Sequence, residues 1–213
     1  MTAFDHIRDP AEIYRRSFAA IRAETDLAGL APDRAALAVR LVHACGMPDI
    51  VANLAWGGEP VAAGRRALAD GAPVLVDAAM VAHGVIRPRL PRDNAVICTL
   101  NDPGVADDAR AGATTRSAAA VDRWTDRLDG AVVAIGNAPT ALFRLLELLA
   151  EGAPRPAVVL GFPVGFIGAA ESKQALVDHA GTLPFVTLRG RRGGSALAAA
   201  AVNALAALED TTE

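Results

Sequence analysis

Five short runs of apolar residues recur through the last two thirds of the 213-residue chain. They are rich in Val, Ile, Leu and Ala, and they are nearly continuous rather than alternating with polar residues. Continuous apolar runs of this length are typical of β-strands covered on both faces, as in a parallel sheet. We therefore predict strands at residues 73–81, 95–100, 131–136, 157–161 and 185–189.

Segments with helical periodicity separate or flank these predicted strands. Two of them open with proline, which the first turn of a helix tolerates because its N–H groups have no intrahelical partner. We predict helices at residues 10–27, 32–45, 59–70, 102–112, 114–128, 138–151, 169–180 and 195–208. The alternation predicts an α/β fold, a three-layer α/β/α sandwich with right-handed crossovers. We expect a single domain over residues 1–213, with a frayed tail at residues 209–213.

Three predicted strand-to-helix junctions are rich in Gly or Pro: residues 136–140, 161–166 and 189–195. In a parallel sheet such junctions meet at the carboxyl edge, where ligands bind. The N–H groups at a helix N-terminus favour anions, and the third junction adds three arginines. The alternative is ordinary turn and capping chemistry. Together the junctions indicate a pocket for an acidic ligand.

The charge pattern agrees with an acidic ligand and argues against nucleic acid. The net charge is −3, which argues against binding to nucleic acid through general basicity. Lys173 is the only lysine among 21 cationic residues, and the arginines suit carboxylates because their forks bind them bidentately. A GC-rich genome is the alternative explanation of the arginine count.

Several classes of protein lack support in the sequence. There is no dinucleotide-binding or P-loop motif, no nucleophile elbow, and no histidine spacing that suits a metal, so we expect no cofactor and no metal. Cys45 and Cys98 have no CxxC spacing and are expected to pack as small apolar groups in a reduced cytosol. No signal-peptide pattern or apolar run of about 18 residues occurs, so we expect a cytoplasmic protein without a membrane partner.

The sequence closely resembles the precorrin isomerase family over nearly its whole length. Residues 42–46 read VHACG, residues 115–120 read TRSAAA, and residues 161–173 read GFPVGFIGAAESK. Further matching segments are residues 13–18, 71–75, 80–84, 96–103, 130–147 and 189–200. The resemblance implies a flavodoxin-like fold with a five-stranded parallel sheet, and a homodimer. It also implies cobalamin biosynthesis: a methyl group moves from C-11 to C-12 of precorrin-8X to give hydrogenobyrinic acid, without a cofactor.

The resemblance places the catalytic histidine of the family at His43. This residue falls in the last turn of the predicted helix at residues 32–45, where the negative end of the helix dipole stabilises imidazolium. Histidine can donate and recover a proton near neutral pH, which would assist the shift by protonating the macrocycle. The alternative is a structural histidine on a mostly apolar helix.

The resemblance also supplies candidate substrate contacts. Ser17, Arg40 and Arg116 match family positions that contact substrate, and Arg15 and Arg191 are further candidates to hold carboxylate arms. For each arginine the alternative is a solvated surface charge. Asp77 is a candidate hydrogen-bond orienter. Two positions depart from the family pattern and leave the fine substrate preference open, Ile86 and Phe162.

Other functions remain open at this point. One is the cobalt-containing reaction, on cobalt-precorrin-8, giving cobyrinic acid. Another is a non-catalytic tetrapyrrole carrier, and a third is a flavin or nucleotide binder, because a fold alone does not determine function. Neighbouring enzymes of the cobalamin pathway are expected as further partners.

Overall fold

A computed structural model describes residue 4 and residues 6–207 of the chain. One mixed sheet of six strands runs through its centre, in the order β1-β6-β5-β4-β2-β3. The strands are β1 (Leu54–Gly57), β2 (Val74–Val76), β3 (Val96–Ile97), β4 (Val132–Ile135), β5 (Val158–Gly161) and β6 (Phe185–Leu188). The predicted tail at residues 209–213 lies outside the described residues. The α/β prediction is confirmed.

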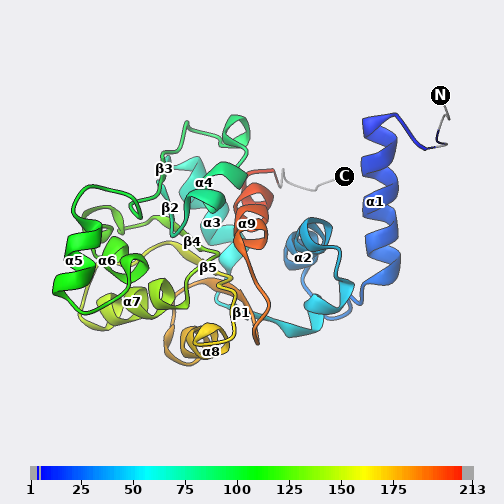
Figure 1. Cartoon of the computed structure of the whole chain (residues 1–213). Coiled ribbons are helices and arrows are strands. Elements are labelled where there is room, and N and C mark those ends of the chain that lie inside the picture. The colour runs from blue at the N-terminus through cyan, green and yellow to red at the C-terminus, as the bar shows by residue number, and fades with distance from the viewer. Residues whose placement is uncertain (1–3, 5, 208–213) are drawn as a thin grey trace.

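Helices cover both faces of this sheet (Figure 1). The α-helices are α1 (Pro10–Glu24), α2 (Pro32–Cys45), α3 (Pro60–Ala69), α4 (Ala79–Gly84), α5 (Val105–Ala111), α6 (Arg116–Asp122), α7 (Pro139–Ala150), α8 (Ala169–His179) and α9 (Ser195–Ala207). The short 3-10 helices are η1 (Pro48–Asn53), η2 (Arg87–Arg89) and η3 (Thr125–Arg127).

The two faces of the sheet bury different side chains. Val132 and Ala134 of β4 belong to the core shared with α2, α3, α4 and α9. Val133 and Ile135 of the same strand belong to the core shared with α6, α7 and α8. Successive side chains point to opposite faces of a strand, so a continuous apolar run feeds both cores. This is why the predicted buried runs at residues 131–136 and 157–161 form strands β4 and β5.

The predicted sheet of five parallel strands was incomplete. Five strands are parallel, but β1 adds an antiparallel edge through its pairing with β6. Only Ala55 of β1 is buried, so the segment lacks the continuous apolar run that marks the other strands. An edge strand that is half covered gives little sequence signal.

Some predicted boundaries were also wrong. The apolar run at residues 73–81 contains two elements, because β2 ends at Val76 and α4 begins at Ala79. Periodicity cannot separate a short strand from the start of a buried helix. The run at residues 95–100 contributes only the two residues of β3, and residues 114–128 form α6 and the separate 3-10 helix η3.

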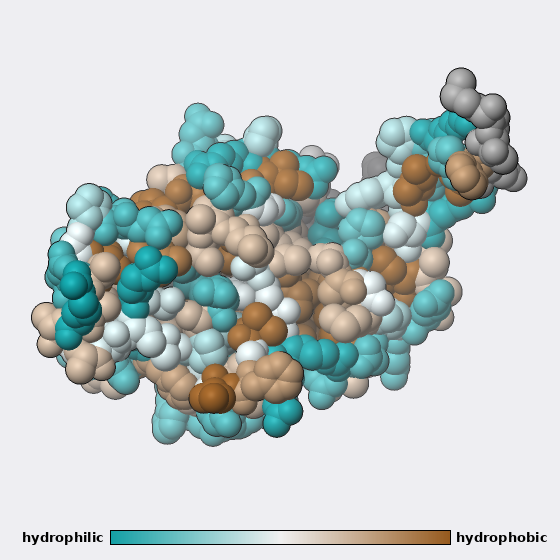
Figure 2. All heavy atoms as spheres, viewed as in Figure 1, coloured by the Kyte–Doolittle hydropathy of each residue, from teal (hydrophilic) through white to brown (hydrophobic). Residues whose placement is uncertain are grey.

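Helix α1 stands apart from the sandwich and packs mainly against α2 (Figure 1). Asp9 caps it by accepting a hydrogen bond from the N–H of Ala11, and no residue of α1 is buried. Ile13 and Tyr14 are among the large apolar side chains that it exposes. Figure 2 shows α1 as a projection beyond the body of the molecule. Among the described residues, no helix is both long and apolar enough to cross a membrane.

Candidate functional site

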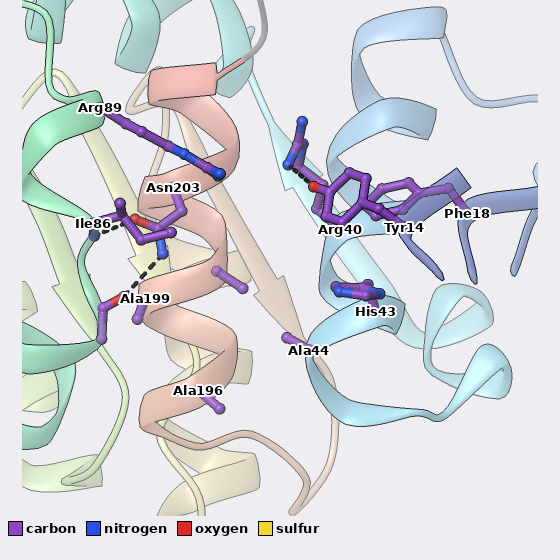
Figure 3. Close-up of a pocket in the computed structure, with 12 residues that line it drawn as sticks. Tyr14, Phe18, Arg40, His43, Ala44, Ile86, Arg89, Ala196, Ala199 and Asn203 are labelled. Carbon is purple, nitrogen blue, oxygen red and sulfur yellow. Dashed lines mark hydrogen bonds between the residues drawn. The ribbon is translucent and has the colours of Figure 1, made fainter. Parts of the chain in front are cut away.

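A cavity of about 400 Å³ lies between two walls that come from distant parts of the chain. Helices α1 and α2 form one wall, and α9 with the segment that follows α4 forms the other (Figure 3). The volume falls in the range of small-molecule sites. The lining residues are Tyr14, Phe18, Arg40, His43, Ala44, Gly84, Ile86, Arg89, Ala196, Ala199, Ala200 and Asn203.

His43 is held on the first wall by contacts from α1. It lies in the last turn of α2, which ends at Gly46 in the left-handed conformation (φ 67°). A hydrogen bond of 3.1 Å joins the Ser17 hydroxyl to Nδ1 of His43. Because Nδ1 is engaged there, Nε2 remains for a ligand, which is the arrangement of a histidine prepared for proton transfer.

Two aromatic rings of α1 flank the imidazole. The Phe18 ring centroid lies 4.9 Å from that of His43, and the Tyr14 centroid lies 5.6 Å away in an edge-on contact. Tyr14, Ser17 and Phe18 are spaced by three and four residues, so they share one face of α1. The same spacing places Arg40 and His43 on one face of α2. The sequence thus brings a hydroxyl, an imidazole and a guanidinium together through two helices.

Arg40 is oriented by the same two aromatic residues. Its Nη1 donates a hydrogen bond of 3.0 Å to the Tyr14 hydroxyl, and its guanidinium carbon lies 5.6 Å from the Phe18 ring centroid. One hydrogen bond leaves most of the five guanidinium donors for a ligand. Arg40 is therefore oriented beside His43 with donors that suit a carboxylate.

Part of the opposite wall is apolar because α9 presents alanines there. Ala196, Ala199 and Ala200 line the cavity there. Helix α4 packs closely against this surface, since a Cβ added at Gly84 would lie only 2.6 Å from the Ala199 Cβ. Figure 2 shows tan and brown residues gathered over α9 and α2, on the face that holds the cavity. A flat apolar wall suits the face of a planar or gently puckered ring system.

The charged side chains that line the cavity are both arginines. A histidine lies beside them, and no Asp or Glu is among the lining residues. Such a set favours an anionic organic ligand. Among the residues that the structure describes, no three His, Cys, Asp or Glu side chains are grouped so as to hold a metal ion.

The comparisons with known proteins agree with this site. The sequence model of the precorrin-8X methylmutase (CbiC) family matches residues 12–208. The chain belongs to the precorrin-8X methylmutase family. A relative from Pseudomonas aeruginosa named precorrin-8X methylmutase is 60% identical over 95% of this chain and 97% of its own. A cobalt-precorrin-8 methylmutase from Priestia megaterium is 33% identical over 95% of this chain and 89% of its own.

A solved structure supports the family assignment at the level of the fold. A crystal structure of the precorrin-8X methylmutase from Thermus thermophilus has a TM-score of 0.83 and is 40% identical to this chain. The similarity covers 92% of this chain and 94% of that one. The two proteins therefore share the fold over most of their length.

Three of the predicted substrate contacts lie outside the cavity. Arg15 is exposed and pairs with Glu12 through bonds of 2.7 and 2.8 Å. Arg116 is the exposed first residue of α6, on the other face of the sheet, and the Arg191 guanidinium carbon lies 5.4 Å from the Phe166 ring centroid. Their roles in substrate binding stay predictions, whereas Ser17, Arg40 and His43 are brought together.

The strand-end junctions do not line the cavity, which lies against α9 instead. At the first junction, residues 136–140, the group that accepts the N–H hydrogen bonds is a carboxylate of the protein itself. The buried Asp77 carboxylate accepts hydrogen bonds from the N–H groups of Gly136 (2.8 Å), Asn137 (2.9 Å) and Ala138 (2.7 Å). Burial raises the pKa of Asp77, and these three N–H groups oppose that rise. At residues 136–138 these bonds agree with the alternative of capping chemistry, and they make Asp77 a hydrogen-bond orienter, as predicted.

The only lysine fastens the glycine loop that follows β6. Lys173 of α8 is fully buried, and its Nζ donates a hydrogen bond of 2.6 Å to the carbonyl of Arg192. Burial lowers the pKa of Lys173 to about 8. The loop also needs glycine at position 193, because a Cβ there would collide with the carbonyl oxygens of Phe162 and Pro163. The lysine thus ties α8 to this loop, and the N–H of Gly194 ties the loop to the carbonyl of Phe162 at 2.8 Å.

Several site residues were missed by the sequence analysis. Tyr14 and Phe18 lie in the segment that carries the family resemblance, and their helical spacing around Ser17 was a usable signal. Arg89 and Asn203 gave no signal in the sequence, because their place at the cavity depends on how α4, η2 and α9 pack. Ile86 does line the cavity, so its departure from the family pattern lies at the site.

Proposed function

We propose that this protein is a precorrin isomerase that moves a methyl group from C-11 to C-12 of precorrin-8X, giving hydrogenobyrinic acid in cobalamin biosynthesis. The observation that carries the proposal is the pairing of His43 with Ser17 in a cavity that is lined by arginines and by no acid. The substrate is a tetrapyrrole with carboxylate arms, which this charge pattern suits.

His43 is the acid and the base of the proposed reaction. In its protonated form it donates a proton from Nε2 to a ring nitrogen or adjacent carbon of the macrocycle. This weakens the bond between the methyl group and C-11. The methyl group then bonds to C-12, and the neutral imidazole recovers the proton, so substrate and product are isomers. Ser17 holds the ring at Nδ1 throughout.

Positioning supplies the rest of the acceleration, because the methyl shift is intramolecular. Arg40 holds a carboxylate arm on the His43 side, and the alanines of α9 lie along the macrocycle. Arg15, Arg116 and Arg191 remain candidates for arms that extend beyond the cavity. The same arms are held before and after the shift, so the product also binds tightly.

We infer that the metal-free substrate is preferred over the cobalt-containing one. The support is the much higher identity to the Pseudomonas relative than to the cobalt-precorrin-8 enzyme. The metal-free macrocycle also leaves the ring nitrogens available for the proton of His43. The cavity lining includes Ile86, which offers no hydroxyl to the ligand.

We also propose a homodimeric, cytoplasmic enzyme with a flavodoxin-like core. The parallel strands in the order β3-β2-β4-β5-β6 support that name, since they follow the doubly wound order 2-1-3-4-5. The exposed apolar residues of α1 support the homodimer, because α1 lacks a core of its own. A biosynthetic substrate supports the cytoplasm, with neighbouring pathway enzymes as further partners.

The test is to incubate the purified protein with precorrin-8X and, in parallel, with cobalt-precorrin-8. The proposal predicts that the ultraviolet-visible spectrum of precorrin-8X changes to that of hydrogenobyrinic acid over many turnovers, and faster than the cobalt reaction. Stoichiometric binding without isomerisation would identify a carrier instead. Faster turnover of the cobalt substrate would reverse the inferred preference.

A further inference from the structure

Arg89 faces His43 and Arg40 from the opposite wall of the cavity (Figure 3). It is the last residue of η2, the 3-10 turn that follows α4, and its side chain extends toward the space between the walls. No hydrogen bond or ion pair joins its guanidinium to another residue that the structure describes. Its donors are therefore left for a ligand.

Asn203 of α9 fixes the segment that carries Arg89. Its Oδ1 accepts a hydrogen bond of 2.8 Å from the N–H of Ile86, and its Nδ2 donates one of 2.9 Å to the carbonyl of Gly84. The N–H of Arg89 then donates to the carbonyl of Ile86 at 2.9 Å. These bonds tie the backbone of Arg89 to the alanine wall, so the point from which its side chain extends is fixed before a ligand arrives.

Several other arginines of the molecule are paired with a carboxylate, whereas Arg89 is not paired with one among the described residues. Arg144 bonds Asp122 at 2.6 Å, and Arg123 bonds Asp108 at 2.6 Å. At the cavity, two guanidinium groups and an imidazole share a space without any carboxylate. Cationic side chains that share a cavity without a carboxylate favour an anionic ligand.

We propose that Arg89 is a substrate-binding residue that holds a second carboxylate arm of the macrocycle, opposite the arm held by Arg40. Asn203 is its positioning residue. This inference rests on the proposed function and adds that the substrate is held by arginines from both walls of the cavity. Arms held from both walls fix the rotation of the macrocycle in its plane, and so determine which methyl-bearing carbon lies beside His43.

The test compares Arg89→Gln with Arg87→Gln, measuring hydrogenobyrinic acid binding and precorrin-8X turnover. Arg87 belongs to the same 3-10 helix and is also exposed, but it does not line the cavity. We expect Arg89→Gln to weaken binding and to raise KM about tenfold, because it removes one charge-assisted contact. We expect Arg87→Gln to stay within about twofold of the wild type. Neither change should alter the unfolding midpoint, because both side chains are exposed.

A modified ligand makes the test specific for a carboxylate. When the arms of the corrinoid are converted to amides, Arg89→Gln and the wild type should bind it almost equally. Asn203→Ala should reproduce part of the KM effect with kcat nearly unchanged, and it should add little to Arg89→Gln, because both changes act on one contact.

The outcomes separate this inference from the function on which it rests. If the wild type binds and converts precorrin-8X but Arg89→Gln behaves like Arg87→Gln, Arg89 does not hold a carboxylate arm and the proposed function stands. If the wild type neither binds nor converts the tetrapyrrole, both are overturned.

Discussion

At the scale of single residues, the site depends on how one imidazole is held. His43 is exposed on the cavity side, yet Ser17, Tyr14 and Phe18 contact it from α1. Hydrogen bonding at Nδ1 orients the ring and leaves Nε2 without this partner. The proposed proton transfer therefore requires that α1 stays packed against α2.

Ser17→Ala tests this orientation. It removes the hydroxyl but keeps the helix, since alanine is a strong helix former. We expect kcat to fall about tenfold with KM nearly unchanged, because the proton donor remains but is less well aligned. Steady-state rates with precorrin-8X, followed by absorbance, measure the effect. An unchanged kcat would show that the bond between Ser17 and His43 plays no part in the reaction.

At the scale of elements, the sequence predicted what depends on local pattern. The buried runs of β4 and β5 and the proline-started helix α2 were found because their signals lie within a few consecutive residues. The edge strand β1 was missed because only one of its residues is buried. The division of residues 73–81 into β2 and α4 was missed because Asp77, between them, bonds backbone groups about 60 residues away.

In the candidate site, too, residues with a local sequence signal were predicted and those placed by distant contacts were not. His43, Ser17 and Arg40 were predicted because the family resemblance rests on segments that contain them or lie beside them. Arg89 reaches the cavity only through bonds between Asn203 and the segment at Gly84 and Ile86, more than 110 residues earlier in the chain. No local pattern reports such a contact.

Lys173, which joins α8 to the loop after β6, allows a test of how burial of its ammonium affects stability. Its pKa is lowered by burial from 10.5 to about 8, so between these values the unfolded chain binds more protons than the folded protein. The free energy of unfolding should therefore rise with pH across that window, by about 3 kcal/mol relative to Lys173→Met. Below pH 8 the difference between the two proteins should be constant.

Chemical denaturation at a series of pH values measures this difference, because groups common to both proteins cancel. Ser172→Ala is the matched control: Ser172 is also fully buried in α8, but its hydroxyl bonds only to the carbonyl of Ala169 within the helix. The free energy of unfolding of Ser172→Ala should depend on pH in the same way as that of the wild type. If Lys173→Met also parallels the wild type, the buried ammonium does not titrate in this window.

At the scale of the whole molecule, α1 is separated from the sandwich that carries the other wall of the cavity (Figure 1). It supplies Tyr14, Phe18 and the Ser17 hydroxyl to the site, but none of its own residues is buried. A helix of this kind gains little stability from its own packing. The proposed homodimer would cover its exposed apolar residues.

Ile13→Asp tests the homodimer. Ile13 is 47% exposed on α1, so the change should leave the fold intact while placing a charge in the proposed interface. We expect the wild type to sediment at twice the chain mass of 21.9 kDa, and Ile13→Asp to shift toward the monomer. Ile167→Asp, at a 90% exposed position in the loop before α8, is the control and should remain dimeric. A monomeric wild type would contradict the proposal.

The most direct test of the account is single-turnover conversion of precorrin-8X by His43→Ala, with tetrapyrrole binding measured on the same sample. The account predicts that conversion falls by at least about a hundredfold, the scale of general acid catalysis, while binding stays within about threefold of the wild type. Conversion at the wild-type rate would contradict it, because the methyl shift would then proceed without the proton of His43.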